Sequence, residues 1–286
     1  MRFPTVRGLL SRSRRGLGLG CGLSRPVAPP GALGRWVGIA MLSVVTIGPA
    51  WHMQPADAGP WDQTGSTPAL DTGRLTAEYH QDFRGGKFDN KTLRLVGGRA
   101  EELVTAEREG LRIRMPAGRN NPAAVGVVPR FRIRGDFEIT ATFTILAADN
   151  PIRGYGVAAT LWAETDTLTE EAVTIERGII PNEGERFTST RISGPQENRK
   201  YDVRRARAKS RSGKIRMERV GSMVTTSYAD GDQPFRKLRT VELGPEELAL
   251  VRAAAETGVS DHAVDVQFEE LTIRAQALPG YVAAKP

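Results

Sequence analysis

The sequence predicts an all-β protein with the fold of a two-sheet antiparallel jelly-roll sandwich and at most one short helix. Segments in which apolar and polar residues alternate recur along the chain, and turn signals separate them about every ten to fifteen residues. The sequence shows no internal repeat, no long amphipathic stretch and no alternation of strands with helices. These three observations are typical of a β-sandwich or jelly roll.

The segment 135–146 is the clearest strand of the chain. Its apolar residues fall on one face of an extended strand and its threonines on the other, because strand side chains alternate between the two faces. The apolar residues are Phe137, Ile139, Ala141, Phe143 and Ile145. An apolar face this regular has to be covered by a second sheet or a helix, so we expect this strand at the centre of a sandwich.

The first 58 residues carry most of the net charge of +7. They hold seven arginines and one acid, Asp57, whereas residues 59–286 carry 33 basic and 32 acidic side chains. An Arg-rich start, an apolar segment over 36–51 and a small-residue site at 56–58 follow one another as in an export signal. We interpret residues 1–58 as a signal peptide or, alternatively, as an uncleaved N-terminal anchor. Both alternatives predict an extracytoplasmic protein: periplasmic, secreted or membrane-anchored.

The rest of the chain is divided by composition into three parts. Residues 59–74 are rich in Gly, Pro, Thr, Ser and Asp and are expected to form a flexible spacer. The jelly-roll domain is expected over 75–277, followed by a loose tail over 278–286. A domain of this size can bury a full core without disulfides. The single cysteine, Cys21, lies in the leader.

The first half of the domain contains one strand whose partner we predict. The segment 155–162 alternates after a turn signal at 149–151, and we expect it to pair with 135–146 as its antiparallel neighbour. Tyr155 is expected to pack in the core, and the glycines of this segment would leave a shallow surface beside Trp162. Other strands are expected over 110–115, 173–179 and 187–192.

The second half of the domain shows a hairpin, a helix start and a bulge. The hairpin is expected about Gly221, between strands 214–220 and 223–228. Pro245 followed by two acids is typical of a helix start, so we expect one helical turn there and then a strand. In the last strand the parity of the apolar residues shifts at Glu269 and Glu270. A β-bulge at this point would keep both halves of the strand facing the core.

The order of these segments resembles that of a known superfamily. Asp82, Phe83 and Phe88 precede 110–113, 135–140, 213–221 and 266–273 along the chain. This series resembles the concanavalin A-like lectin/glucanase superfamily, and within it a family of exported bacterial domains of unknown function. The resemblance covers about 82–277 and implies the sandwich fold. Its motifs mark strands and turns, so they imply fold more than activity.

The enzymes of this superfamily carry three acids on one strand, as Glu-x-Asp-x-Glu or Glu-x-Asp-x-x-Glu. The nearest match here is Glu164, Asp166 and Glu170, where the last acid comes one residue too late. On an extended strand Glu164 and Glu170 would lie about 20 Å apart, too far to act on one glycosidic bond. We therefore expect no catalytic residue in this segment, and we favour a protein that is not an enzyme.

The segment 199–214 is the densest charge feature of the domain. It contains eight basic residues and one acid, Asp202. Such a cluster can bind a polyanion such as a sulfated or uronic polysaccharide, or it can be a solvated strand face balanced by glutamates elsewhere. Only Tyr201 interrupts it, which argues against nucleic acid as the partner, because single strands stack on several aromatics. The candidate ligand-binding residues of this segment are Arg204, Arg205, Arg207 and Lys209.

Two aromatic residues and two acidic turns are further candidates. Trp162 and Tyr228 could stack on sugar rings, or they could serve packing. Asp149 and the turn 230–232 could supply oxygen ligands for calcium, but each also has the composition of an ordinary turn. His80 and His262 lie far apart in the sequence, and this spacing is not that of a zinc site. We therefore predict no cofactor and no metal site.

The leading hypothesis is an exported, non-catalytic recognition module that binds envelope or extracellular polysaccharide. A glycoside hydrolase or lyase of the same fold with an unrecognised site is the first alternative. A structural or protein-interaction domain of the cell envelope is the second. The expected partner is a polysaccharide or another envelope component, with a membrane contact only through the N-terminal segment if it is not cleaved.

Overall fold

The computed structural model describes residues 69–119, 123–258 and 261–283. These residues belong to one compact unit, Gln63–Pro286. The predicted leader and most of the predicted spacer lie outside the described residues. Within the described residues, no helix is long and apolar enough to cross a membrane.

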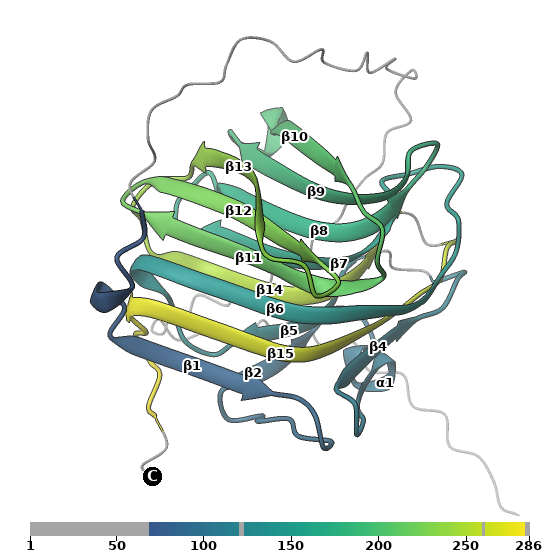
Figure 1. Ribbon diagram of the computed structural model, residues 1–286, viewed down its shortest axis with the longest axis horizontal. Coiled ribbons are helices and arrows are strands. Elements are labelled where there is room, and N and C mark those ends of the chain that lie inside the picture. Colours follow the sequence, from purple (N-terminus) through teal and green to yellow (C-terminus); the bar gives the residue numbers. More distant parts are fainter. Residues whose placement is uncertain (1–68, 120–122, 259–260, 284–286) are drawn as a thin grey trace, which may run out of the picture. The chain divides into compact units, whose positions relative to one another are not determined.

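Two antiparallel sheets face each other in this unit (Figure 1). Sheet A contains β1 (Ala77–Asp82), β3 (Val104–Ala106), β4 (Leu111–Met115), β6 (Arg134–Ala148), β11 (Ser212–Val220), β12 (Met223–Asp230), β13 (Arg236–Glu242) and β15 (Val264–Ala277). Sheet B contains β2 (Leu93–Val96), β5 (Val125–Pro129), β7 (Val157–Thr165), β8 (Ala172–Ile180), β9 (Gly184–Ser193), β10 (Lys200–Arg207) and β14 (Leu248–Thr257).

The strand order of each sheet mixes early and late parts of the chain. Sheet A runs β13-β12-β11-β6-β15-β4-β3, and β1 also pairs with β15. Sheet B runs β10-β9-β8-β7-β14-β5-β2. The described residues contain one α-helix, α1 (Ala100–Leu103), and two 3₁₀ turns, η1 (Thr72–Arg74) and η2 (Gln196–Asn198). The predicted jelly-roll sandwich with at most one short helix is confirmed.

The core lies between the two sheets and is centred on β6. Each of its five predicted inward residues is at most 2% exposed. β6 pairs with β15 on one side and with β11 on the other, in antiparallel register. The predicted bulge in the last strand is present as a register shift between Phe268 and Glu270. It keeps Phe268 and Leu271 both fully buried.

The predicted partner of the central strand is wrong. The segment 157–165 forms β7, which pairs with β8 and β14 in sheet B, whereas β6 belongs to sheet A. The reason lies in Gly154 and Gly156, which take φ values of 79° and 101° and turn the chain out of sheet A instead of extending a strand. Tyr155 lies in this connection and is 86% exposed, so its predicted place in the core is also wrong.

The predicted helical turn at Pro245 is also absent. β14 begins directly at Leu248, and the chain before it bends without forming a helix. The N–H of Leu248, which would close the first helical turn on the carbonyl oxygen of Gly244, donates to the carbonyl oxygen of Ile133 at 2.9 Å instead. The carbonyl oxygens of Gly244 and Glu246 accept hydrogen bonds from Arg219. The hairpin between β11 and β12 at Gly221 is present as predicted.

The end of the chain packs more closely than predicted. Leu278 is 7% exposed, and the ring of Tyr281 lies 5.5 Å from that of Tyr79 in an edge-on contact. The first residues of the predicted loose tail therefore add to the core.

Arg219 of β11 is a fully buried arginine that joins three segments of the chain. Its guanidinium donates to the carbonyl oxygen of Gly135 at 2.6 and 3.0 Å and to that of Glu246 at 2.6 Å. It also lies 4.8 Å from the ring centroid of Phe137. Burial lowers the pKa of Arg219 to about 10, so the side chain stays charged at neutral pH. The start of β6 and the start of β14 are thus held by one side chain.

Arg219→Met is expected to lower the free energy of unfolding by about 2–4 kcal/mol. The substitution keeps much of the side-chain volume but leaves two buried carbonyl groups without a donor. Urea denaturation followed by circular dichroism measures the effect. Arg274→Met is the matched control: its guanidinium makes only a 3.9 Å ion pair with Glu78 at the surface, and a change below about 0.5 kcal/mol is expected. Equal losses in both variants would contradict this role of Arg219.

Candidate functional site

One face of sheet B points away from the core, and cross-strand register orders its side chains into rows. Thr188 of β9, Glu176 of β8 and Thr160 of β7 lie directly opposite one another. Arg205 of β10 and Ala254 of β14 extend this row at its two ends. We call these five residues the Glu176 row. Their sequence neighbours point into the core, so the row lies on the outer face of sheet B.

Two hydroxyl groups of the Glu176 row have no hydrogen-bond partner. Thr160 is 1% exposed and Thr188 is 2% exposed, and neither side-chain oxygen contacts a donor or acceptor of the protein. A buried hydroxyl without a partner costs about 1–3 kcal/mol, so such groups are rare unless something else binds them. The two hydroxyls flank Glu176 and make the Glu176 row a candidate ligand site.

Glu176 itself is held in its neutral form. Burial, and to a lesser extent the nearby Glu256, raise the pKa of Glu176 from its ordinary 4.5 to about 8, while Arg205 acts in the opposite direction. A protonated carboxyl group can donate one hydrogen bond and still accept others. The row therefore presents a neutral carboxyl between two hydroxyls, which suits a ligand rich in hydroxyl groups.

Trp162 lies in the next row of the same face, one step along β7 from Thr160. Its indole Nε1 donates to Glu164 at 3.1 Å, and the guanidinium of Arg252 lies 5.1 Å from its ring centroid. Arg252 in turn bonds Glu256 at 3.0 Å. The predicted site residues Trp162 and Arg205 thus lie on the outer face of sheet B, on either side of Glu176.

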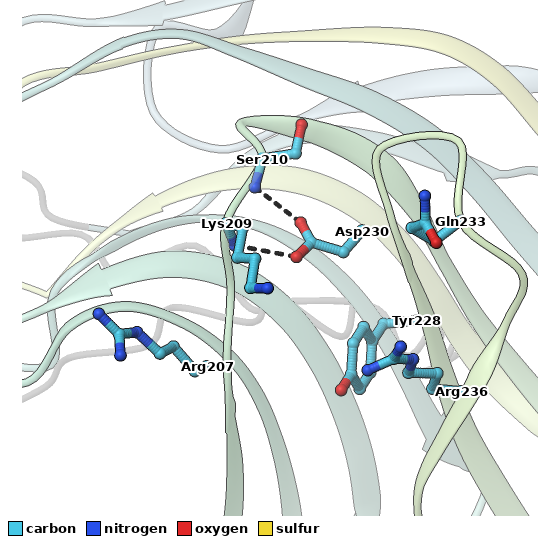
Figure 2. Close-up of a pocket in the computed structure, with 7 residues that line it drawn as sticks. All are labelled: Arg207, Lys209, Ser210, Tyr228, Asp230, Gln233 and Arg236. Carbon is cyan, nitrogen blue, oxygen red and sulfur yellow. Dashed lines mark hydrogen bonds between the residues drawn. The ribbon is translucent and has the colours of Figure 1, made fainter.

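Three other predicted site residues come together in a pocket of about 620 Å³. Arg207, Lys209 and Tyr228 line it together with Asp230 of the candidate calcium turn and three residues that the sequence analysis did not single out: Ser210, Gln233 and Arg236. We call this the cationic pocket. Figure 2 shows Arg207 and Arg236 on opposite sides of the view, with Lys209 between them.

The floor and wall of the cationic pocket are fixed by buried contacts. The ring of Tyr228 stacks on that of Phe187, with centroids 4.2 Å apart. Arg177 is fully buried, lies 5.7 Å from the Phe187 ring centroid and donates to the carbonyl oxygen of Ser210 at 2.7 and 2.9 Å. The segment that carries Lys209 and Ser210 is therefore anchored to the core.

Asp230 is the one carboxylate among the residues that line the cationic pocket. It accepts the backbone N–H of Lys209 at 2.9 Å and that of Ser210 at 2.7 Å (Figure 2). These two bonds fit the alternative that 230–232 is an ordinary turn. In the part of the chain that the structure describes, no group of three or more His, Cys, Asp or Glu side chains could hold a metal ion.

The remaining cations of 199–214 are partly balanced by glutamates, as the second interpretation of this segment required. Arg199 pairs with Glu170 at 3.1 Å, Arg205 with Glu183 at 3.1 Å and Arg211 with Glu185 at 3.4 Å. Arg204 lies opposite Ser189, which is buried towards the core, so Arg204 points to the other side of β10. It is not part of the cationic pocket or of the Glu176 row.

The expected separation of Glu164 and Glu170 is wrong. The chain turns back after β7, where the N–H of Thr165 donates to the carbonyl oxygen of Glu171. As a result the charge of Glu170 contributes to a raised pKa of Glu164, whose main cause is burial. The expected separation requires an extended strand from Glu164 to Glu170, but β7 ends at Thr165.

Solved structures of the same fold class are similar to this one at low sequence identity. A beta-1,3-1,4-glucanase (lichenase) derived from a mouse hindgut metagenome has a TM-score of 0.51 and 9% identity over 70% of this chain and 99% of its own. A family 16 endo-glucanase from Bacteroides ovatus has a TM-score of 0.51 and 13% identity over 68% and 99%. The GH43 protein BlXynB from Bacillus licheniformis has a TM-score of 0.50 and 10% identity, and the match covers 68% of this chain but only 39% of its chain.

These matches and the two-sheet topology define the class of protein: a concanavalin A-like jelly-roll sandwich. A search of curated proteins finds no match. A family model described as "Protein of unknown function (DUF1583) C domain" matches residues 63–286. The chain therefore belongs to the DUF1583 C domain family, and the expected likeness to a family of unknown function with this fold is confirmed.

Glu176→Gln is expected to raise the thermal unfolding midpoint at about pH 9 and to leave it almost unchanged at about pH 4. The pKa of Glu176 in the folded protein, about 8, is above the ordinary 4.5, so the folded state holds the proton more tightly than the unfolded state. The stability linked to this proton is fully present below about pH 4.5 and is lost as the pH rises to about 8. Glutamine is neutral and removes that loss.

Scanning calorimetry at both pH values measures the two midpoints. Glu197→Gln, an exposed position in η2, is the matched control and should behave as the wild type at either pH. A stabilisation by Glu176→Gln that is the same at both pH values would show that the proton of Glu176 is not its cause.

Proposed function

We propose that this protein is an exported, non-catalytic recognition module that binds polysaccharide on the outer face of sheet B. The observation that carries the proposal is the pair of buried, unpaired hydroxyls of Thr160 and Thr188 on either side of Glu176. The Arg-rich leader with its apolar segment supports export. The names of two proteins with similar structures, a lichenase and an endo-glucanase, support a polysaccharide as the ligand class.

The chemistry of the Glu176 row matches the hydroxyl groups of a sugar. A sugar hydroxyl donates one hydrogen bond and accepts others, as do the neutral carboxyl of Glu176 and the two threonine hydroxyls. Trp162 adds an aromatic ring beside the row, and aromatic faces pack on the apolar face of a sugar ring. Hydrogen bonds and ring packing by these side chains would therefore be enough to bind a sugar.

The double change Thr160→Val and Thr188→Val is expected to weaken polysaccharide binding by about tenfold or more, because each bound hydroxyl contributes about 0.5–1.5 kcal/mol. It should not destabilise the fold, since neither hydroxyl has a protein partner to lose. Affinity electrophoresis of the full chain in gels that contain dextran, mixed-linkage glucan or polygalacturonate measures the binding.

Thr142→Val is the matched control for this experiment. Thr142 lies opposite Lys214 on the outer face of sheet A. Its substitution by valine therefore makes the same chemical change on the other sheet. Its binding should equal that of the wild type. If no polysaccharide retards the wild type, or if the double variant binds as well as the wild type, the proposal fails. Co-purification with a protein partner would then favour a structural or protein-interaction domain of the envelope.

A glycoside hydrolase is the second candidate, and one observation favours it. Glu176 has a raised pKa, and Glu256 lies on the same face, paired with Arg252 at 3.0 Å. Glycosidases use two carboxyl groups, one of which has a raised pKa and donates a proton. We rank this candidate second because Glu256 is already engaged by Arg252 and the acid motif of the superfamily is incomplete.

Glu176→Gln separates the two candidates. A recognition module releases no reducing ends from any of the three polysaccharides and should still bind after this substitution, because glutamine keeps donor and acceptor atoms. A hydrolase would release reducing ends, and Glu176→Gln would abolish the release while binding persists. A colorimetric assay of reducing ends, run beside the gels, makes this comparison.

A further inference from the structure

We propose that the cationic pocket binds the anionic group of an acidic polysaccharide, either a sulfate ester or a uronate carboxylate. This inference rests on the proposed function and narrows its ligand from polysaccharide in general to an acidic one. It concerns a second part of the surface, which contributes no residue to the Glu176 row.

Positive charge exceeds negative charge in the lining of the cationic pocket. No ion pair among the described residues involves Arg207, Lys209 or Arg236, although most other arginines of the described chain pair with a carboxylate. Asp230 is the one carboxylate of the lining, and its two oxygens also accept the N–H groups of Lys209 and Ser210, so it offsets one of the three positive charges. The pocket therefore keeps an excess of positive charge.

The geometry of the pocket suits one oxyanion held from several sides. Arg207 ends β10, Arg236 begins β13, and Lys209 lies on the segment between β10 and β11, so the cations come from three places in the chain. Figure 2 shows Lys209 between Arg207 and Arg236. Guanidinium groups bind sulfate and carboxylate through paired hydrogen bonds, and an ammonium group adds a compact charge. Tyr228 adds a hydroxyl at the edge.

The pocket borders the proposed sugar-binding face at the end of β10. Arg205, the last residue of the Glu176 row, and Arg207 lie on the same face of β10, about 7 Å apart along the strand. Arg207 also lines the pocket, so the row and the pocket meet at the end of β10, whereas Tyr228 of the pocket packs on Phe187 towards the core. An acidic polysaccharide that follows the row to Arg205 and bends around the end of β10 would place sugar hydroxyls on the row and an anionic group in the pocket.

The same features argue against nucleic acid as the ligand. Single strands bind through exposed aromatic rings on which bases stack. The one aromatic residue of the pocket, Tyr228, is 9% exposed, and its ring is already stacked on Phe187. A volume of about 620 Å³ accommodates one charged group and part of its sugar rather than a run of bases.

The first arm of the test uses inorganic sulfate and does not depend on polysaccharide binding. Sodium sulfate is titrated into the isotope-labelled full chain at constant ionic strength, and amide shifts are followed by NMR. Shifts should concentrate at 207–211 and 228–236. Arg236→Gln should weaken sulfate binding by about tenfold, because a charged hydrogen bond contributes about 1.4 kcal/mol or more.

The second arm compares polymers that differ only in charge: dextran sulfate with dextran, and polygalacturonate with its methyl ester. The pair with the larger preference identifies a sulfate ester or a uronate as the source of the anion. Arg204→Gln is the matched control for both arms. It removes the same charge from β10 but from the other side of the strand, and it should bind as the wild type.

Two results would overturn the inference. If Arg204→Gln weakens binding as much as Arg236→Gln, the attraction is the diffuse charge of 199–214 and not the pocket. If neutral and acidic polymers bind equally, the pocket does not select the ligand, although the proposed function stands. If sulfate binds in the pocket but no polymer is retained, the proposed function fails. The anion of the pocket would then not come from a polysaccharide, and the pocket would be a site for small oxyanions.

Discussion

The pairing of β6 with β15 and β11 is the constraint on which the rest of the sandwich depends. β6 is fifteen residues long, and its alternation decides which side chains of sheet A face the core. Because a slip of one residue would turn the whole apolar face to solvent, its partners have to follow its register. β15 does so only through register shifts, one of them at Phe268 and Glu270. The fold thus depends on one strand and on a bulge that keeps its neighbour in phase.

Buried arginines connect this core to the surface. Arg177 and Arg219 are the two largest side chains that are completely enclosed among the described residues. Arg219 holds the starts of β6 and β14 through backbone carbonyls, and Arg177 holds the segment after β10. Both bury a charge, which is tolerated only because several acceptors surround each guanidinium. Arg177 thereby makes the position of the cationic pocket a consequence of core packing.

The alternation of apolar and polar residues along single strands made much of the fold predictable. The connections between strands could not be predicted in this way. The apolar face of β6, the hairpin at Gly221 and the bulge in β15 follow from local pattern. The location of β7 in the other sheet depends on the conformation of Gly154 and Gly156, which a strand-like pattern conceals. No helix forms at Pro245 because the N–H of Leu248 bonds Ile133, which is distant in sequence. Local signals fail where a distant residue or a glycine sets the path.

The candidate site shows the same division between local and long-range information. Arg207 and Lys209 were found because they lie in one basic segment, but Arg236 joins them only through the pairing of β12 with β13, which sets it opposite Tyr228. Glu176 carried no local signal, since a single glutamate in an apolar strand gives no hint of its unpaired threonine neighbours. The two unpaired buried hydroxyls are unfavourable for the free protein, whereas the three cations are exposed and hydrated. Under the proposed function a ligand would satisfy the hydroxyls, so they would serve binding rather than the stability of the fold.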